Sequence, residues 1–338
     1  MNLCEGLGFK YLSFQEQQAY KIILKAFSAM AASFKCPQIN QNEDLMKIIQ
    51  TVLGDNPSVT YFDKTKIQIE ESFLDKRIIL TGVYSKHQAE KMNQSLEATV
   101  NMIASSLNTG ANNEYSLLIN LSEFLQKNIR YDKEENQVNS KGISINPSSH
   151  NAYGALLMKR AVCDGFSSAF ALLAKKLGFE CMLVVGRSAY ISTTLVNHAW
   201  NIVKVKNGFY HMDVTWDAKK YSEVGDYSYS YFALDDNEIK NDHEWDKTVL
   251  PICHSNDLSY YIRNGLYANN IAHLNDIIRK SNYNPIRLKL SPSINLPGNP
   301  EQYLFQIYAN TIAQTGKHTQ ITYSWNEKQR SFFAKPIK

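Results

Sequence analysis

Cysteine is scarce in this chain, and its spacing argues against both disulfides and metal sites. The 338 residues hold an odd number of cysteines with no CxxC pair: Cys4, Cys36, Cys163, Cys181 and Cys253. Disulfide frameworks and cysteine-based zinc sites need paired, closely spaced cysteines. The sequence also lacks an acidic cluster with the spacing of a calcium loop. We therefore expect no disulfide framework, no metal site and no cofactor.

Long apolar runs and concentrated charge are missing too. No stretch approaches 18 uninterrupted apolar residues, so we expect no membrane span. The 36 Lys+Arg and 32 Asp+Glu give a net charge of +4, and the basic residues are scattered, which argues against nucleic-acid binding. The first residues, MNLCEGLGFKYL, lack the basic and apolar regions of an export signal. We expect a cytoplasmic protein or, alternatively, an exported or cell-surface protein whose signal was removed. The oligomeric state is left open.

The length favours more than one compact unit, and the pattern of apolar residues favours three. We expect an N-terminal accessory α+β domain over residues 1–85, with helices near 13–33 and 43–53. Three extended runs follow these helices: SVTYF, KIQIEESF and RIILTGVY. Period-two spacing places Ile67, Ile69 and Phe73 on one face of this small sheet.

The remaining two units are a catalytic domain over 86–254 and a small C-terminal α/β accessory domain over 255–338. Apolar residues recur every three or four positions over 86–107 and 114–129, which predicts two helices. A polar loop of about 20 residues follows over 131–150, and loops of that length are commonly functional. The last unit has the pattern of a strand (LSYYI), a helix, a strand, a helix and a hairpin.

The stretch from 151 to 217 carries a cysteine, a histidine and an aspartate in the order Cys163, His198, Asp213. Cys163 begins a predicted helix whose inward face is Phe166, Phe170, Leu173 and Leu177. The unpaired N–H groups and the dipole at a helix N-terminus favour the thiolate. Free cysteine is equally common as a small buried apolar residue, so the helix alone does not decide between a nucleophile and packing.

His198 and Asp213 lie on two extended runs, HAWNIVKV and FYHMDVTW, joined at Asn207-Gly208, a strong hairpin signal. A two-residue turn there puts both side chains on one face but sets Asp213 opposite Ile202, about 13 Å along the strand from His198. A hydrogen bond between the two therefore requires a bulge, or a turn centred before Asn207.

If the three residues meet, they form a catalytic triad. Cys163 attacks an amide carbonyl, His198 transfers the proton, and Asp213 orients the imidazole. The backbone N–H of Cys163 and one side-chain donor would stabilise the oxyanion. Tyr153 is a weak candidate for that donor.

Gln137 and Asn151 are weaker candidates than Tyr153 for the oxyanion donor. For all three residues we favour an ordinary role instead: a buried tyrosine for Tyr153, and solvated loop amides for Gln137 and Asn151. Trp200 and Trp216 are weak candidates for walls of the substrate site and would serve equally well as core aromatics of the sheet. His211 is more simply a buried structural histidine than the base.

The runs NAYGALLMKRAVCDGFSSAFALLAKKLGFECMLVVG and NHAWNIVKVKNGFYHMDVTWD resemble the core of bacterial transglutaminase-like proteins, and YFALDDNEIKNDHEWD is similar to the segment that follows it. The resemblance covers about residues 110–250. It implies a papain-like α+β fold, in which the helix that bears Cys163 packs on an antiparallel sheet. It also implies that Cys163 is the nucleophile, His198 the base and Asp213 the orienting acid, and that the last two come together.

The chemistry of the acyl-enzyme leaves alternatives open. An amine acceptor gives acyl transfer at protein glutamine side chains, which we favour, whereas water gives deamidation or proteolysis. A different class of function is a non-catalytic module that binds protein or cell-wall material. An intact Cys, His and Asp set argues against that last reading.

Overall fold

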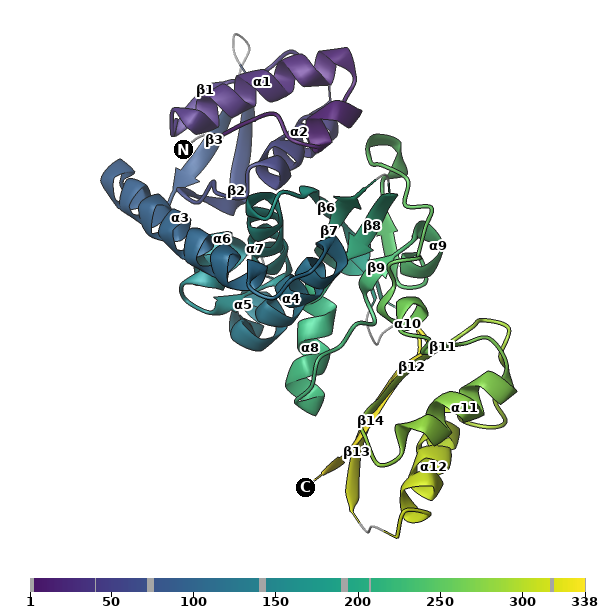
Figure 1. The fold of residues 1–338 in the computed structure, drawn as a ribbon. Coiled ribbons are helices and arrows are strands. Elements are labelled where there is room, and N and C mark those ends of the chain that lie inside the picture. Colours follow the sequence, from purple (N-terminus) through teal and green to yellow (C-terminus); the bar gives the residue numbers. More distant parts are fainter. Residues whose placement is uncertain are drawn as a thin grey trace.

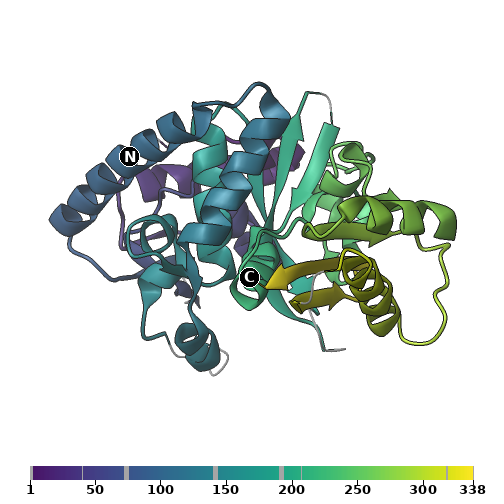
Figure 2. The same cartoon turned by 60° about the horizontal axis from the view of Figure 1, so that its bottom comes forward.

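The structure is a computed structural model that describes residues 3–39, 41–71, 76–139, 144–189, 194–206, 208–316 and 319–337. It is a mixed α+β protein, as the sequence predicts. Figure 1 shows three successive parts, each with its own sheet: the N-terminal part at the top, the central part, and the C-terminal part at the lower right. The view in Figure 2 also places the long helix α3 and the C-terminal part at opposite ends of the molecule.

The N-terminal part packs two helices on a three-stranded antiparallel sheet of order β1-β3-β2. Its elements are η1 (Gly8–Tyr11), α1 (Phe14–Ser28), β1 (Ser33–Lys35), α2 (Asn42–Asp55), β2 (Phe62–Glu71) and β3 (Lys76–Gly82). The first helix is shorter than predicted because Met30 adopts a left-handed φ of 53°, after which the chain enters β1. Of the run SVTYF only Phe62 is in a strand. Ile67 and Ile69 are half-buried against the core, and Phe73 lies outside the described residues.

The central part begins with the two predicted helices, α3 (Lys86–Asn108) and α4 (Glu114–Asn128). The prediction of a plain loop over 131–150 is wrong in part, because α5 (Lys133–Asn139) and η2 (Pro147–His150) occupy much of it. Two short strands, β4 (Arg130–Tyr131) and β5 (Arg160–Ala161), pair in parallel on either side of η2 and α6 (Ala152–Leu156).

The central sheet has the order β10-β6-β7-β8-β9, and every neighbouring pair is antiparallel. Helix α7 (Cys163–Lys176) packs on β6 and β7. The strands and the remaining elements are β6 (Glu180–Ser188), β7 (Val196–Val205), β8 (Gly208–Met212), α8 (Val214–Val224), β9 (Phe232–Leu234), α9 (Asp236–Ile239), β10 (His243–Trp245) and η3 (Lys247–Val249).

Close packing fixes the start of α7. A Cβ on Gly165 would lie 2.2 Å from the carbonyl oxygen of Ser149, so only glycine lets η2 approach the first turn of the helix. Val162 N–H donates to the same carbonyl at 3.0 Å. Further along, Phe166 and Phe170 are fully buried in the core. These contacts fix the position of Cys163, which is half-buried at the N-terminal end of the helix.

The C-terminal part has a mixed sheet of order β11-β12-β14-β13, in which β11 and β12 are parallel. Its elements are α10 (Tyr260–Arg263), β11 (Tyr267–Ala268), α11 (Ile271–Ser281), β12 (Ile286–Leu290), α12 (Pro300–Ala313), β13 (Gln320–Asn326) and β14 (Ser331–Ile337). The predicted strand LSYYI is wrong. It contains the short helix α10, whose Tyr261 is buried against the central core.

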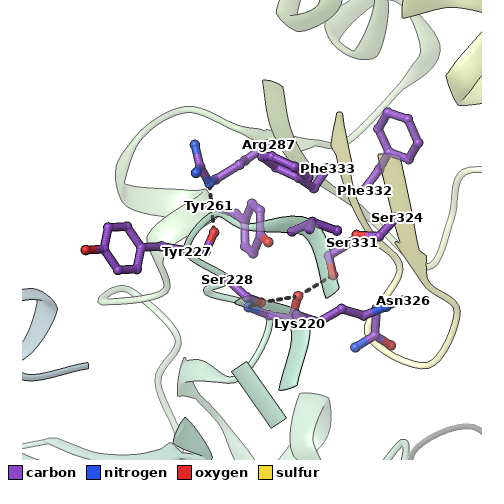
Figure 3. A pocket seen from close by; sticks show the side chains of 12 residues that line it. Lys220, Tyr227, Ser228, Tyr261, Arg287, Ser324, Asn326, Ser331, Phe332 and Phe333 are labelled. Atoms are coloured by element: carbon purple, nitrogen blue, oxygen red, sulfur yellow. Dashed lines mark hydrogen bonds between the residues drawn. The ribbon is translucent and has the colours of Figure 1, made fainter. Parts of the chain in front are cut away.

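A small cavity lies where the C-terminal sheet meets the central part (Figure 3). Arg287 Nε donates to the carbonyl oxygen of Tyr227 at 3.1 Å beside it, and the hydroxyls of Ser230 and Ser331 are 2.6 Å apart. Its volume of about 20 Å³ has room for about one water molecule. This cavity is part of the packing between the two units and is too small for a substrate.

Within the described ranges, no helix combines the length and the apolar character needed to cross a bilayer. The domain boundaries given above stay a prediction.

Candidate active site

Cys163 is the first residue of α7 and is half-buried, with Val162 as the N-cap residue. It lines a cavity of about 240 Å³ together with Asp164, His198 and Ala199. The His198 ring is close enough to the thiol for a hydrogen bond that raises the pKa of the imidazole. The structure therefore brings the predicted nucleophile and base together at one cavity.

His198 is held on its other side by Asp213. Its Nε2 lies 2.7 Å from Asp213 Oδ2, which leaves Nδ1 for the thiol. Burial alone would lower the pKa of His198, but the charge and hydrogen bond of Asp213, with a further contribution from Cys163, raise it to about 9. The imidazolium form is therefore stabilised at neutral pH.

Both predicted tryptophan walls lie against this histidine instead of lining the cavity. The ring of Trp216 stacks on His198 at 4.8 Å between centroids and 27° between planes, and its Nε1–H donates to Ser188 Oγ at 3.1 Å. Trp200 is fully buried and stacks at 6.0 Å. Stacking on two large rings restricts the imidazole to the plane in which it meets Asp213.

The strand register explains how Asp213 reaches His198. Val205 pairs with Gly208 and Ile202 pairs with His211, so Asp213 falls beside Trp200 and not beside Ile202. The expected separation of 13 Å is wrong because the turn is centred one residue earlier than assumed, which shifts every cross-strand pair by two residues. Lys206 enters the turn with a left-handed φ of 53°, and Asn207 lies outside the described residues.

Asp213 directly follows β8, which ends at Met212, and caps helix α8, which orients its carboxylate. Oδ1 accepts the backbone N–H groups of Thr215 (3.0 Å) and Trp216 (3.1 Å) at the start of α8. Oδ2 is then directed at His198. Burial would raise the pKa of Asp213, but the two histidines that contact it lower that pKa to about 2. The carboxylate therefore stays ionised at any pH at which the protein would work.

The second of these histidines is His243 on β10, which the sequence reasoning missed. Its Nε2 lies 3.1 Å from Asp213 Oδ2, and its Nδ1 lies 2.6 Å from Asp242 Oδ1. Burial lowers the pKa of His243, but the two carboxylates more than offset this and raise it to about 9. The tract DHEW, with an acid beside a histidine close to the core, was the available signal.

The C-terminal hairpin extends this network. Asp242 Oδ2 accepts the hydroxyl of Tyr231 at 2.7 Å, and Asp242 Oδ1 accepts Gln329 Nε2–H at 3.1 Å. Asn326 Nδ2–H also donates to the Tyr231 hydroxyl at 3.1 Å. A part predicted as accessory thus supports, through Asp242, the histidine that contacts Asp213.

His150 marks another polar cluster at the cavity that the sequence reasoning missed. Its Nδ1 lies 2.8 Å from Asp164 Oδ2, and its Nε2 lies 3.0 Å from Glu135 Oε1. Burial lowers the pKa of His150, but Asp164 and Glu135 raise it to about 9. Asp164, the residue after Cys163, is thereby paired with a cation.

The oxyanion candidates are placed as follows. Tyr153 is half-buried against the helical core and is not among the residues that line the cavity. Asn151 caps α6, because its Oδ1 accepts the N–H groups of Tyr153 and Gly154 at 3.0 and 3.1 Å. Gln137 is exposed on α5. Their oxyanion role stays a prediction.

Tyr131 is a polar group near the thiol that the sequence reasoning did not consider. Burial raises the pKa of its hydroxyl, and the negative charges of Cys163 and Asp213 raise it further, which places the ring beside the site. The hydroxyl donates to Asn136 Oδ1 at 3.1 Å, and Asn136 itself lines the cavity.

Among the described residues, two side-chain groups have the donor types of metal ligands: His198, Asp213 and His243, and also His211, Asp236 and Cys253. In the second group Trp200 Nε1–H donates to His211 Nδ1 at 3.0 Å, so the neutral ring carries its proton on Nε2 and donates it to Asp236 Oδ1 at 2.9 Å. That proton occupies the position a metal would need. In the first group Asp213 Oδ2 is already hydrogen-bonded to the rings of His198 and His243. Hydrogen bonds therefore explain why the residues of both groups lie close together.

Residues 101–214 match the model of the transglutaminase-like superfamily. The central segment of this chain is transglutaminase-like. The segment matched contains Cys163, His198 and Asp213 and ends one residue into α8. The resemblance read from the sequence is therefore confirmed.

Two solved structures also match part of this chain. One is a crystal structure of a TGase, with 16% identity, a TM-score of 0.32 and 44% of each chain covered. Another is a provisionally assigned cysteine protease from Cytophaga hutchinsonii, with 10% identity, a TM-score of 0.28, and 44% of this chain and 61% of that chain covered. The alignments thus span about half the length of those proteins. A comparison with curated proteins gave no match.

Proposed function

We propose that this protein is a thiol acyltransferase that acts on protein glutamine side chains through Cys163, His198 and Asp213. The observation that carries the proposal is the position of His198, which contacts the Cys163 thiol on one side and lies 2.7 Å from Asp213 on the other, at an open cavity. A nucleophile, a base and an orienting acid in this relation are the parts of a catalytic triad.

The reaction follows from these positions. The Cys163 sulfur attacks the glutamine carbonyl carbon, and the oxyanion forms near the N-terminus of α7, where the first N–H groups of the helix have no partner within it. The His198 imidazolium gives its proton to the leaving nitrogen, so ammonia departs and a thioester remains. A lysine amine of a second protein then attacks the thioester, His198 takes up its proton, and an isopeptide bond forms as the thiol is regenerated.

Hydrolysis is the second candidate reaction. The cavity is open to solvent, and water attacking the same thioester would give deamidation, whereas attack on a backbone amide would make the enzyme a cysteine protease. A non-catalytic binding module is the third candidate, and the three residues assembled at the cavity argue against it.

The test is incorporation of a fluorescent primary amine into a glutamine-bearing protein, with ammonia release measured in parallel. Amine uptake by the wild type and its loss in Cys163→Ala support the acyltransferase. Ammonia release without amine uptake indicates a deamidase, and new peptide ends indicate a protease. Cys4→Ser is the matched control, because Cys4 is an exposed free thiol outside the cavity.

A further inference from the structure

The N-terminal part supplies a wall of the cavity that contains Cys163. Residues of α2 and β2 line it together with the thiol: Met46, Gln50, Leu53, Lys64, Thr65 and Ile67. The contact is close, since Gly54 of α2 packs on Leu183 of β6, where an added Cβ would come within 3.1 Å of the leucine Cβ. Lys175 of α7 also donates to the carbonyl oxygen of Asp55. A substrate bound in this cavity would therefore also contact α2 and β2.

Lys64 is the one lysine or arginine among the described residues around this cavity. The Lys64 side chain is half-buried, and its ammonium has no hydrogen bond or ion pair within the described part of the chain. Its immediate charged neighbour is Asp164, which is already paired with His150 at 2.8 Å. Burial lowers the pKa of Lys64 to about 8, with Asp164 opposing that shift.

An unpaired ammonium in a half-enclosed cavity is costly to keep, because burial removes part of its hydration and no described residue replaces that hydration. Such groups are commonly found where a ligand supplies the missing charge. The aliphatic side chains of Leu53, Ile67, Leu183 and Val185 also line the cavity, together with the polar side chains of Gln50, Thr65, Asn136 and Asn197. This combination suits a peptide that places one anionic group among aliphatic contacts.

We propose that Lys64 binds a carboxylate of the acyl-donor peptide, so that the enzyme selects glutamines with an acidic group close by. This inference rests on the proposed function and names its substrate class. The carboxylate could be an Asp or Glu side chain next to the reactive glutamine or the free C-terminus of the peptide. Both present the same pair of oxygens to the ammonium.

The experiment compares N-acetylated peptides that differ only beside the glutamine: a neighbouring Glu, Gln or Lys with an amidated C-terminus, and a neutral peptide with a free C-terminal carboxylate. The kcat/KM for amine incorporation is measured for wild type, Lys64→Met and Lys64→Glu. Lys66→Met is the matched control, because Lys66 is exposed two residues along β2 and pairs with Asp63 at 3.3 Å.

We expect the wild type to prefer one or both carboxylate peptides by about ten- to a hundredfold, the range of a hydrogen bond between charged groups. Which of the two is preferred identifies the source of the carboxylate. Lys64→Met should lower kcat/KM for the carboxylate peptides to the value for the neutral peptide, and Lys64→Glu should favour the Lys peptide. Lys66→Met should behave as wild type. The turnover of the neutral peptide also shows that each variant is folded.

A wild type without preference, or a preference that survives Lys64→Met, would overturn the inference. Protection of Cys163 from iodoacetamide by the same peptides gives a readout that needs no turnover. If no peptide is turned over but the carboxylate peptides still protect wild type and not Lys64→Met, the proposed function fails and the role of Lys64 stands. If Lys64→Met also slows alkylation of Cys163 without peptide, Lys64 acts on the thiol itself and the inference is wrong.

Discussion

His243→Gln should raise the pKa of His198. His243 is buried between two carboxylates and its pKa of about 9 keeps it positively charged at neutral pH. Its ring centroid lies 5.4 Å from that of His198, and both rings contact the same oxygen of Asp213. A positive charge at this position opposes protonation of His198, so removing the charge favours the imidazolium. Glutamine retains an N–H group that can still donate to Asp213.

The size of the effect follows from the separation of the two rings. Two unit charges 5.4 Å apart repel by about 0.8 kcal/mol at the dielectric constant of water and by about 3 kcal/mol at an effective constant of 20. One pKa unit corresponds to about 1.4 kcal/mol. The expected rise for His198 is therefore about 0.6 to 2 units, with the upper end favoured because both rings are buried.

Alkylation of Cys163 by iodoacetamide as a function of pH measures this shift without a known substrate. In a thiolate–imidazolium pair, the alkylation rate changes when the thiol ionises and changes a second time, at higher pH, when the imidazolium of His198 loses its proton. This second change, the alkaline limb of the profile, should move to higher pH in His243→Gln. The measurement uses a Cys4→Ser background, because Cys4 is exposed whereas Cys36, Cys181 and Cys253 are buried.

His254→Gln, a change at an exposed histidine, is the control. An alkaline limb that stays in place or moves to lower pH in His243→Gln would refute the reasoning, since it would mean that His243 is neutral or only fills space.

Two predictions concern stability. Because the folded-state pKa of His150 is raised from 6.5 to about 9, its ion pairs stabilise the protein fully below about pH 6.5 and lose that effect as the pH rises through 9. The difference in free energy of unfolding between wild type and His150→Gln should thus shrink by about 1–3 kcal/mol over this range, as measured by urea denaturation at several pH values, and a pH-independent difference would contradict it. Gly165→Ala should cost about 1–3 kcal/mol or more, because the added methyl meets the Ser149 carbonyl at 2.2 Å. Gly82→Ala, which meets nothing within 4 Å, is its thermal-denaturation control, and equal melting temperatures for the two variants would show that η2 moves aside.

Local patterns in the sequence were enough to place most elements. The apolar spacing of α3 and α4 and the run IRLKL of β12 correspond closely to the observed bounds. Errors occurred where local preference and tertiary context disagree. The apolar LSYYI forms a helical turn because Tyr261 is drawn into the central core, and the polar segment 131–150 is ordered in part because Glu135 bonds His150 and the N–H groups of Ile145 and Asn146.

The sequence by itself determined that a cysteine at a helix start precedes a histidine and an aspartate in two successive extended runs joined by a turn, because short-range periodicity and turn residues define those positions. Only the tertiary structure decided that Asp213 meets His198, since moving the centre of the turn by one residue shifts every cross-strand pair by two residues. Residues distant in sequence complete the site in the same way. His243 reaches Asp213 from β10 and Lys64 reaches the cavity from the N-terminal sheet, and no local pattern encodes such contacts.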